Sequence, residues 1–415
     1  MTRMILFVIC AIMIFSCHTP DPMIIEPPVV VKDTIFDLKW KVNLASPYRE
    51  IVVSRYVQVY KNWYITTGDK GDPGLILYAF DINTGEKVWE WHHSGKVKDY
   101  IRTMRIKDHI LVMDTGPGLI AMDLDSRAIL WEINHYETVS GYGVPLNIIG
   151  DYAYKYLSKG NFNYPDEAFL LRFKVNTGAV DTVYSVPEEG VWAPQLSGPA
   201  IWVDPMSKDS IIVFVNSRGN INKSPQDSPT DLYAVNLRTK KLVWKQTSFC
   251  EVSTSMHFQP VIYGNDVLMG GDWSIYSYDI PTGKLNWRRP FDKLKPFGSF
   301  NNTQHLLVGD LIYVNPDVFY VMCIHAGTGE VLWHNETDAP NCTFEMLYYE
   351  DMLIFTSWGY GSVMILDGLT GKLIHRERAY DDSPFSTNVV YHQNSDMFFT
   401  QNYKQAFGFK IRKPK

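Results

Sequence analysis

The sequence predicts an all-β protein, an eight-bladed β-propeller in which each blade is a four-stranded sheet. Three observations carry this prediction. One short sequence frame recurs along the chain. It consists of alternating apolar residues, then a turn, then a tryptophan. The intervals from Trp89 to Trp131, from Trp244 to Trp287 and from Trp333 to His375 are 42 or 43 residues, and the two ends of the chain hold complementary pieces of one such unit. A period of about 40–45 residues is typical of a propeller blade.

The repeated frame is clearest at residues 77–89 (LYAFDINTGEKVW) and 275–287 (IYSYDIPTGKLNW). Its alternating apolar residues indicate a strand, the Thr-Gly step indicates a tight turn, and the residues up to the tryptophan indicate the returning strand. The frame recurs with substitutions at residues 120–131, 170–182, 232–244, 327–333 and 367–375.

A tryptophan that returns in one frame is expected to be structural, because its large flat ring suits a position between neighbouring sheets. We expect burial between blades for the tryptophans of the frame, and a packing role for His375, which stands at the same position. The turns at Ser126-Arg127 and Thr239-Lys240 lack glycine, so they should be strained or of another type. The structural repeat tryptophans are Trp40, Trp89, Trp131, Trp244, Trp287 and Trp333.

The ends of the chain predict how the ring closes. Eight third strands can be counted, near residues 76, 120, 170, 232, 275, 320, 363 and 406. The last unit stops before its fourth strand, whereas residues 36–44 look like a fourth strand without the preceding three. The N-terminal strand should therefore complete the last blade, since an open ring would leave two sheet edges unpaired. The predicted propeller spans residues 35–412.

The N-terminus has the features of a lipoprotein signal peptide. A short segment with Arg3 precedes an apolar run, residues 5–15, which is too short to span a bilayer and ends at Ser16-Cys17. We expect residues 1–17 to be the signal region and Cys17 to carry the lipid anchor; an ordinary signal peptide is the alternative. Residues 18–34 contain four prolines and are expected to form a flexible tether.

Composition sets further limits on function. The chain has 415 residues and a net charge of −6, which gives no electrostatic reason to expect a nucleic-acid partner. Besides Cys17, the predicted mature chain holds Cys250, Cys323 and Cys342, with no CxxC motif. Whether Cys323 and Cys342 pair, and the oligomeric state, stay open at this point.

The Leu-Tyr-Ala-x-Asp-x-x-Thr-Gly-x-x-x-Trp frame resembles the repeat of the quinoprotein alcohol dehydrogenase-like (PQQ-like) propellers, over residues 36–412. The enzymes of this family hold pyrroloquinoline quinone and calcium in the central channel, beneath an adjacent Cys-Cys disulfide. The resemblance implies that an enzyme of this kind would carry the same features. This sequence has no Cys-Cys pair and no CxxCH motif. We therefore expect no cofactor, no metal ligands and no catalytic residues, since fold alone does not imply function.

A lipobox followed by eight such blades is similar in architecture to the outer-membrane assembly lipoproteins of the BAM complex. This resemblance implies a non-catalytic, lipid-anchored scaffold on the bacterial outer membrane, facing the periplasm, with an envelope protein as its partner. Two alternatives stay open: a lipoprotein that binds a glycan or small ligand, and a quinone-dependent dehydrogenase.

Loop lengths suggest where a partner binds. The connections between second and third strands and between blades are longest at residues 136–145, 158–167, 187–197 and 217–230. Long loops on one side of a rigid scaffold usually carry the binding function. Tyr142, Trp192 and Arg218 lie in these segments and belong to residue types that often dominate binding energy, so they are the predicted interaction residues.

Overall fold

The structure is a computed structural model, and it describes most of the chain after Ile35. The described residues are 35–44, 56–68, 75–93, 101–115, 118–134, 138–139, 146–160, 165–190, 192–220, 229–250, 260–271, 274–291, 305–315, 321–335, 345–357, 361–378 and 383–412. Residues 35–415 form one compact unit. Among the described residues there is no helix of the length and apolar character needed to cross a membrane.

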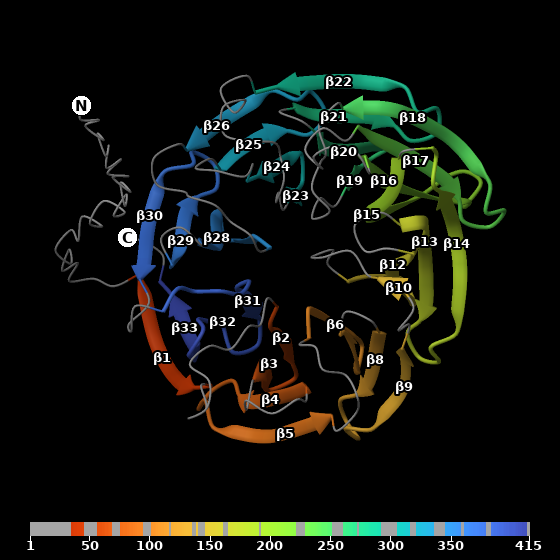
Figure 1. Cartoon of the computed structure of the whole chain (residues 1–415). Coiled ribbons are helices and arrows are strands. Elements are labelled where there is room, and N and C mark those ends of the chain that lie inside the picture. Colours follow the sequence, from red (N-terminus) through yellow and green to blue (C-terminus); the bar gives the residue numbers. More distant parts are fainter. Residues whose placement is uncertain are drawn as a thin grey trace, which may run out of the picture. The chain divides into compact units, whose positions relative to one another are not determined.

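The described strands form eight antiparallel sheets arranged around a common axis, which confirms the predicted eight-bladed propeller (Figure 1). The four strands of each blade are called A, B, C and D. Strand A lies nearest the centre of the ring and strand D lies at its outer edge. Blades 1 and 2 are β2 (Gln58–Tyr60), β3 (Trp63–Gly68), β4 (Leu75–Asp81), β5 (Lys87–His93), and β6 (Thr103–Lys107), β7 (Ile110–Asp114), β8 (Gly118–Asp123), β9 (Ile129–Asn134). Blades 3 and 4 are β11 (Asn147–Ile149), β12 (Tyr152–Gly160), β13 (Pro165–Lys174), β14 (Val180–Pro187), and β15 (Trp192–Val203), β16 (Ser210–Asn220), β17 (Thr230–Asn236), β18 (Leu242–Cys250).

The second half of the ring repeats this plan. Blades 5 and 6 are β19 (Val261–Tyr263), β20 (Asp266–Gly271), β21 (Ser274–Asp279), β22 (Leu285–Pro290), and β23 (His305–Val308), β24 (Leu311–Val314), β25 (Val321–His325), β26 (Val331–Asn335). Blade 7 is β27 (Leu347–Tyr349), β28 (Met352–Ser357), β29 (Ser362–Asp367) and β30 (Leu373–Arg378). Blade 8 is β31 (Val390–His392), β32 (Met397–Gln401), β33 (Gln405–Ile411) and β1 (Phe36–Asn43).

Blade 8 closes the ring as the sequence predicts. Strand β1 pairs with β33, from Phe36 opposite Ile411 to Asn43 opposite Gln405. The two strands lie side by side at the ring seam although they come from opposite ends of the chain (Figure 1). A backbone hydrogen bond of 2.7 Å from Arg412 N to Ile35 O continues the pairing.

The core of the propeller lies between blades rather than within them. The buried apolar residues form eight clusters in the described part of the chain, and each cluster joins two neighbouring blades. For example, Leu111 and Ile120 of blade 2 pack with Ile65 and Leu77 of blade 1. Both faces of a sheet must therefore be apolar, which explains the fully buried third strands of the repeated frame.

Each repeat tryptophan lies on the turn of the next blade. The indole Nε1 of Trp131 donates a 2.7 Å hydrogen bond to Val175 O of blade 3, and its ring covers Gly178 in the turn that follows. The pairs Trp40–Gly85, Trp244–Gly283, Trp287–Gly329 and Trp333–Gly371 repeat this contact. Trp40, Trp89, Trp131 and Trp333 are buried, whereas Trp244 and Trp287 are half-buried.

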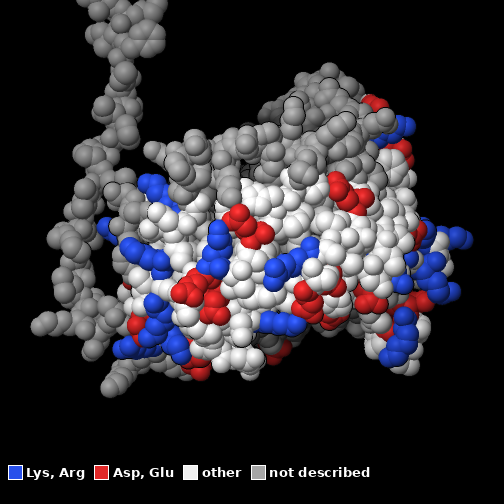
Figure 2. Space-filling view, turned by 90° about the horizontal axis from the view of Figure 1, so that it is seen from below, with Lys and Arg blue, Asp and Glu red and all other residues white. Residues whose placement is uncertain are grey.

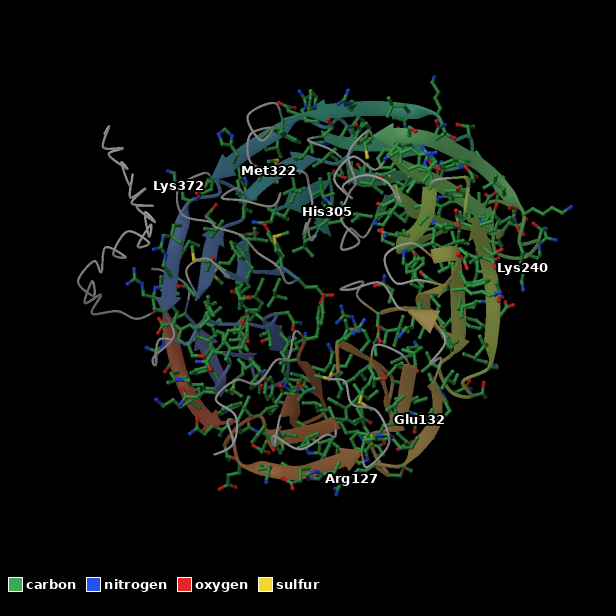
Figure 3. All side chains as sticks on the ribbon, viewed as in Figure 1. Arg127, Glu132, Lys240, His305, Met322 and Lys372 are labelled. Atoms are coloured by element: carbon green, nitrogen blue, oxygen red, sulfur yellow. The ribbon has the colours of Figure 1, made fainter. Side chains whose placement is uncertain are left out.

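The two turns without glycine keep the left-handed backbone of the others. Arg127 and Lys240 have φ values of 61° and 57° at the positions that glycine occupies elsewhere. They are therefore strained turns of the same type. Both side chains lie at the outer edge of the ring (Figure 3). The Arg127 guanidinium lies 5.9 Å from the ring centroid of Trp89, and Lys240 Nζ pairs with Asp181, so each side chain contacts the preceding blade.

Blades 3 and 4 differ from the prediction because their strands are long. Residues 192–203 form strand β15 and residues 210–220 form strand β16, so residues 192–197 and 217–220 of the segments predicted as loops are strand. Cross-strand pairing runs from Val203–Ser210 to Trp192–Asn220 and continues the hairpin beyond the length of the other blades. The short strand β10 (Thr138–Val139) also pairs with β12, where the sequence predicts a loop.

Candidate functional site

Two of the three predicted interaction residues meet at one end of blade 4. Trp192 begins strand β15, and Arg218 lies near the end of strand β16, opposite Pro194. The Arg218 Cζ atom lies over the Trp192 ring, 5.5 Å from its centroid. This end of the sheet holds the B–C and D–A connections, and we call it the connection edge. Tyr142 and the predicted anchor Cys17 lie outside the described residues.

A buried carboxylate organises this site. Asp231, in strand β17, is fully buried, and its Oδ1 lies 3.2 Å from Arg218 Nε. Its Oδ2 lies 3.0 Å from Lys245 Nζ in strand β18, and its Oδ1 accepts a 2.8 Å hydrogen bond from Ser248 N. A buried carboxylate is stable only when it is paired and hydrogen-bonded. Asp231 therefore holds both cations in fixed positions.

Hydrogen bonds and aromatic contacts hold the two cations further. Arg218 Nη2 donates to Ser248 Oγ at 2.6 Å, and the Arg218 side chain is only 13% exposed. Burial alone would lower the pKa of Lys245, but its contacts with Tyr233 and Asp231 outweigh burial and raise that pKa above its ordinary value. Lys245 is thus charged at neutral pH, with its Nζ 5.0 Å from the centroid of the Tyr233 ring.

The turn between blades 3 and 4 fixes the aromatic side of the site. Trp192 N donates to Glu189 O at 3.2 Å, and Glu189 N donates to Trp192 O at 3.1 Å. These two backbone hydrogen bonds close the turn that precedes β15. The Glu189 side chain is 55% exposed and lies 3.8 Å from Lys245 Nζ. The site, defined as Glu189, Trp192, Arg218, Asp231 and Lys245, presents an aromatic ring, a guanidinium and a carboxylate on rigid strands.

Sequence reasoning missed Asp231 and Lys245. A signal for Asp231 exists in the repeat itself, because the equivalent positions of four other blades hold uncharged residues, namely Ile76, Gly118, Ser274 and Ser362. A charge that interrupts a buried strand in one copy of a repeat needs a partner. Lys245 has no comparable signal, since the residue after the tryptophan is polar in most copies.

The described cysteines and histidines were candidates for a reactive site, but their surroundings indicate structural roles. Cys250 and Cys323 are buried, and burial raises the pKa of the Cys323 thiol to about 12. Cys342 lies outside the described residues. His305 begins the innermost strand of blade 6 (Figure 3), and His375 contacts Glu377 and stacks on Phe36.

Binding of the quinone and calcium ion of the enzyme branch would require suitable side chains in this chain. A calcium ion needs several oxygen ligands from one site. Within the described ranges, no three side chains of His, Cys, Asp or Glu gather closely enough to hold a metal ion. The described residues therefore hold no such cluster for a calcium ion. Lys, Arg, Asp and Glu are interspersed over the face shown in Figure 2.

Two overlapping segments, residues 191–317 and 272–404, match the family model of the outer membrane protein assembly factor BamB. Together they span residues 191–404, more than half of the chain. The chain belongs to this family. The predicted resemblance to PQQ-like repeat propellers and to the outer-membrane assembly factor is thereby confirmed. None of the curated proteins matches the sequence.

Solved structures share the fold of this BamB-family chain at low sequence identity. BamB from Moraxella catarrhalis has a TM-score of 0.58 and 15% identity, covering 90% of this chain and 99% of that one. A europium-containing methanol dehydrogenase has a TM-score of 0.65 and 11% identity, covering 91% and 93%. The computationally designed Ika8 protein has a TM-score of 0.62 and 14% identity, covering 89% and 99%. At these identities the likeness shows a shared fold and no shared activity.

Proposed function

We propose that this protein is a non-catalytic scaffold of the bacterial cell envelope that binds a partner protein through the site on blades 3 and 4. The observation that carries the proposal is Asp231, which is fully buried and holds Arg218 and Lys245 in place at the connection edge. Burying the carboxylate of Asp231 lowers the stability of the fold. A site that retains this carboxylate is therefore expected to gain specificity for a partner from the two fixed cations. Membership of the BamB family supports a role in protein assembly.

The residue types of the site suit binding to a protein surface. Trp192 and Arg218 are of the residue types that most often dominate protein–protein binding, and both are largely immobilised before a partner arrives. Preorganised side chains lose little conformational entropy on binding. One face of the Trp192 ring is covered by Arg218, so that face does not serve as a platform for a sugar.

The N-terminal sequence and the family support a proposed location. The apolar run that ends at Cys17 supports lipid attachment, and the tether at residues 18–34 would connect the lipid to the propeller. We infer that the lipid lies in the outer membrane and that the propeller faces the periplasm, where it assists the assembly of outer-membrane proteins. The proposed partner is a component of that assembly machinery.

Arg218→Ala and Trp192→Ala test the proposal. Each should weaken partner binding by at least about 2 kcal/mol, the loss typical of a hot-spot residue. The matched control is Arg238→Ala, in the same blade but at the opposite end of its strands, where Arg238 is 71% exposed and pairs with Asp209 at 2.7 Å. The readout is capture of outer-membrane assembly components from solubilised membranes, quantified by mass spectrometry.

The result expected is loss of those components with both site variants and retention with the control. Equal capture by all three variants would remove the site on blades 3 and 4 from consideration. Melting temperatures measured in parallel separate lost binding from lost folding, because Arg218 also neutralises Asp231.

A further inference from the structure

An ion pair between Arg105 and Glu345 joins two blades that are not neighbours. Arg105 lies on β6, the innermost strand of blade 2, and Glu345 lies two residues before β27, the innermost strand of blade 7. Arg105 Nη2 contacts Glu345 Oε1. Because blades 8 and 1 separate blades 7 and 2 in the ring, this ion pair crosses the centre of the propeller.

The guanidinium is held in place from its own side of the ring. Arg105 Cζ lies 4.5 Å from the centroid of the Tyr56 ring, and Arg105 Nη1 donates to Met104 O at 3.2 Å. The Arg105 side chain is 16% exposed. A guanidinium that is stacked on an aromatic ring and hydrogen-bonded to the backbone keeps its orientation without a carboxylate.

Glu345 is the more replaceable member of the pair. Its side chain is 40% exposed, so solvent and solutes reach its carboxylate. An ion pair with an exposed partner contributes little to stability, because water solvates the separated charges almost as well. The carboxylate of Glu345 thus occupies a preformed site that another carboxylate can enter.

We propose that Arg105 and Tyr56 form a binding site for a carboxylate-bearing ligand at the centre of the ring, and that Glu345 fills this site when no ligand is present. A guanidinium binds a carboxylate with two parallel hydrogen bonds, which selects this group by geometry as well as charge. The carboxylate belongs either to a small free acid or to the carboxyl terminus of a peptide. The site is separate from that on blades 3 and 4, so neither proposal depends on the other.

Calorimetric titration of the intact propeller distinguishes these sources. The probes are succinate, the tripeptide Gly-Gly-Ala with a free carboxyl terminus, and the same tripeptide as its carboxamide. Glu345→Gln removes the internal competitor and should tighten binding of the carboxylate probes about two- to fivefold. Arg105→Met should abolish their binding. Arg412→Met, which breaks the exposed pair with Asp37 on the rim, is the control and should bind like the unmodified protein.

Binding of succinate identifies a small acid as the ligand class, and binding of the free tripeptide alone identifies a peptide terminus. The proposal is overturned if Glu345→Gln binds neither carboxylate probe more tightly than the unmodified protein does. Equal binding of the carboxamide and the free tripeptide would also overturn it. If Arg105→Met does not fold, as judged by its melting curve, the comparison with Glu345→Gln decides alone.

Discussion

Gly178 lies directly against the indole of Trp131, although the two residues belong to different blades. A Cβ atom on Gly178 would lie 2.8 Å from Trp131 Cγ and Cδ2, closer than carbon atoms can approach. Gly178 also has a φ of +69°, so both the turn and the packing require glycine there. The repeated Thr-Gly step therefore serves two purposes, since it reverses the chain and receives the tryptophan of the preceding blade.

Gly178→Ala should destabilise the protein by about 2–5 kcal/mol, the sum of left-handed strain and overpacking against the indole. Gly264→Ala is the matched control, because Gly264 has a φ of +59° but nothing within 4 Å of an added Cβ. It should lose only about 1–2 kcal/mol. Chemical denaturation of both variants measures the difference, and equal losses would mean that the tryptophan contact contributes nothing.

Removing strand β1, residues 36–43, should open the ring and lower the melting temperature markedly or cause aggregation. The deletion leaves the edge of β33 unpaired and removes the buried side chains of Phe36 and Trp40. Deletion of residues 18–34, the predicted tether, leaves β1 in place and serves as the control. Unchanged melting of the β1 deletion in calorimetry would contradict closure by this strand.

Tyr156→Phe should make the protein more resistant to alkali. Burial raises the pKa of Tyr156 well above its ordinary value, and its hydroxyl has no hydrogen-bond partner among the described residues. Above about pH 10 the unfolded chain loses this proton while the folded chain retains it, so stability falls as the pH rises. The variant's melting temperature should exceed that of the unmodified protein by a larger margin at pH 11 than at pH 7. Equal melting temperatures at pH 11 would contradict this prediction.

Cys17→Ser should release the protein from membranes or block its processing, because the proposed lipid is the membrane anchor. Fractionation of cells followed by detection of the processed and unprocessed chain measures this. A processed variant that still sediments with membranes would count against lipid attachment at Cys17.

Much of the fold could be predicted because the repeat encodes it locally. The alternating strands, the Thr-Gly turns and the half-blades at the two ends each leave a pattern in the sequence, and the pairing of β1 with β33 follows from them. The extension of blades 3 and 4 could not be predicted in the same way. Residues 192–197 and 217–220 are mixed in polarity, and only their pairing across the hairpin makes them strand.

The candidate site was only partly predictable for a related reason. Trp192 and Arg218 stand out by residue type, but their contact depends on the length of β15 and β16. Lys245 reaches Asp231 from a neighbouring strand, and Arg105 reaches Glu345 from across the ring. The first contact depends on the register of β17 and β18, and the second joins distant parts of the chain, so no local pattern in the sequence predicts either of them.

The central claim, that the connection edge of blade 4 contacts a partner, is tested most directly by site-specific photocrosslinking in cells. A photoreactive phenylalanine analogue replaces Glu189, which is 55% exposed beside Lys245, or Met206, which is 89% exposed at the opposite end of the same blade. We predict a crosslink to an outer-membrane assembly component from position 189 and none from position 206. Crosslinking from position 206 alone, or from both positions equally, would contradict the claim.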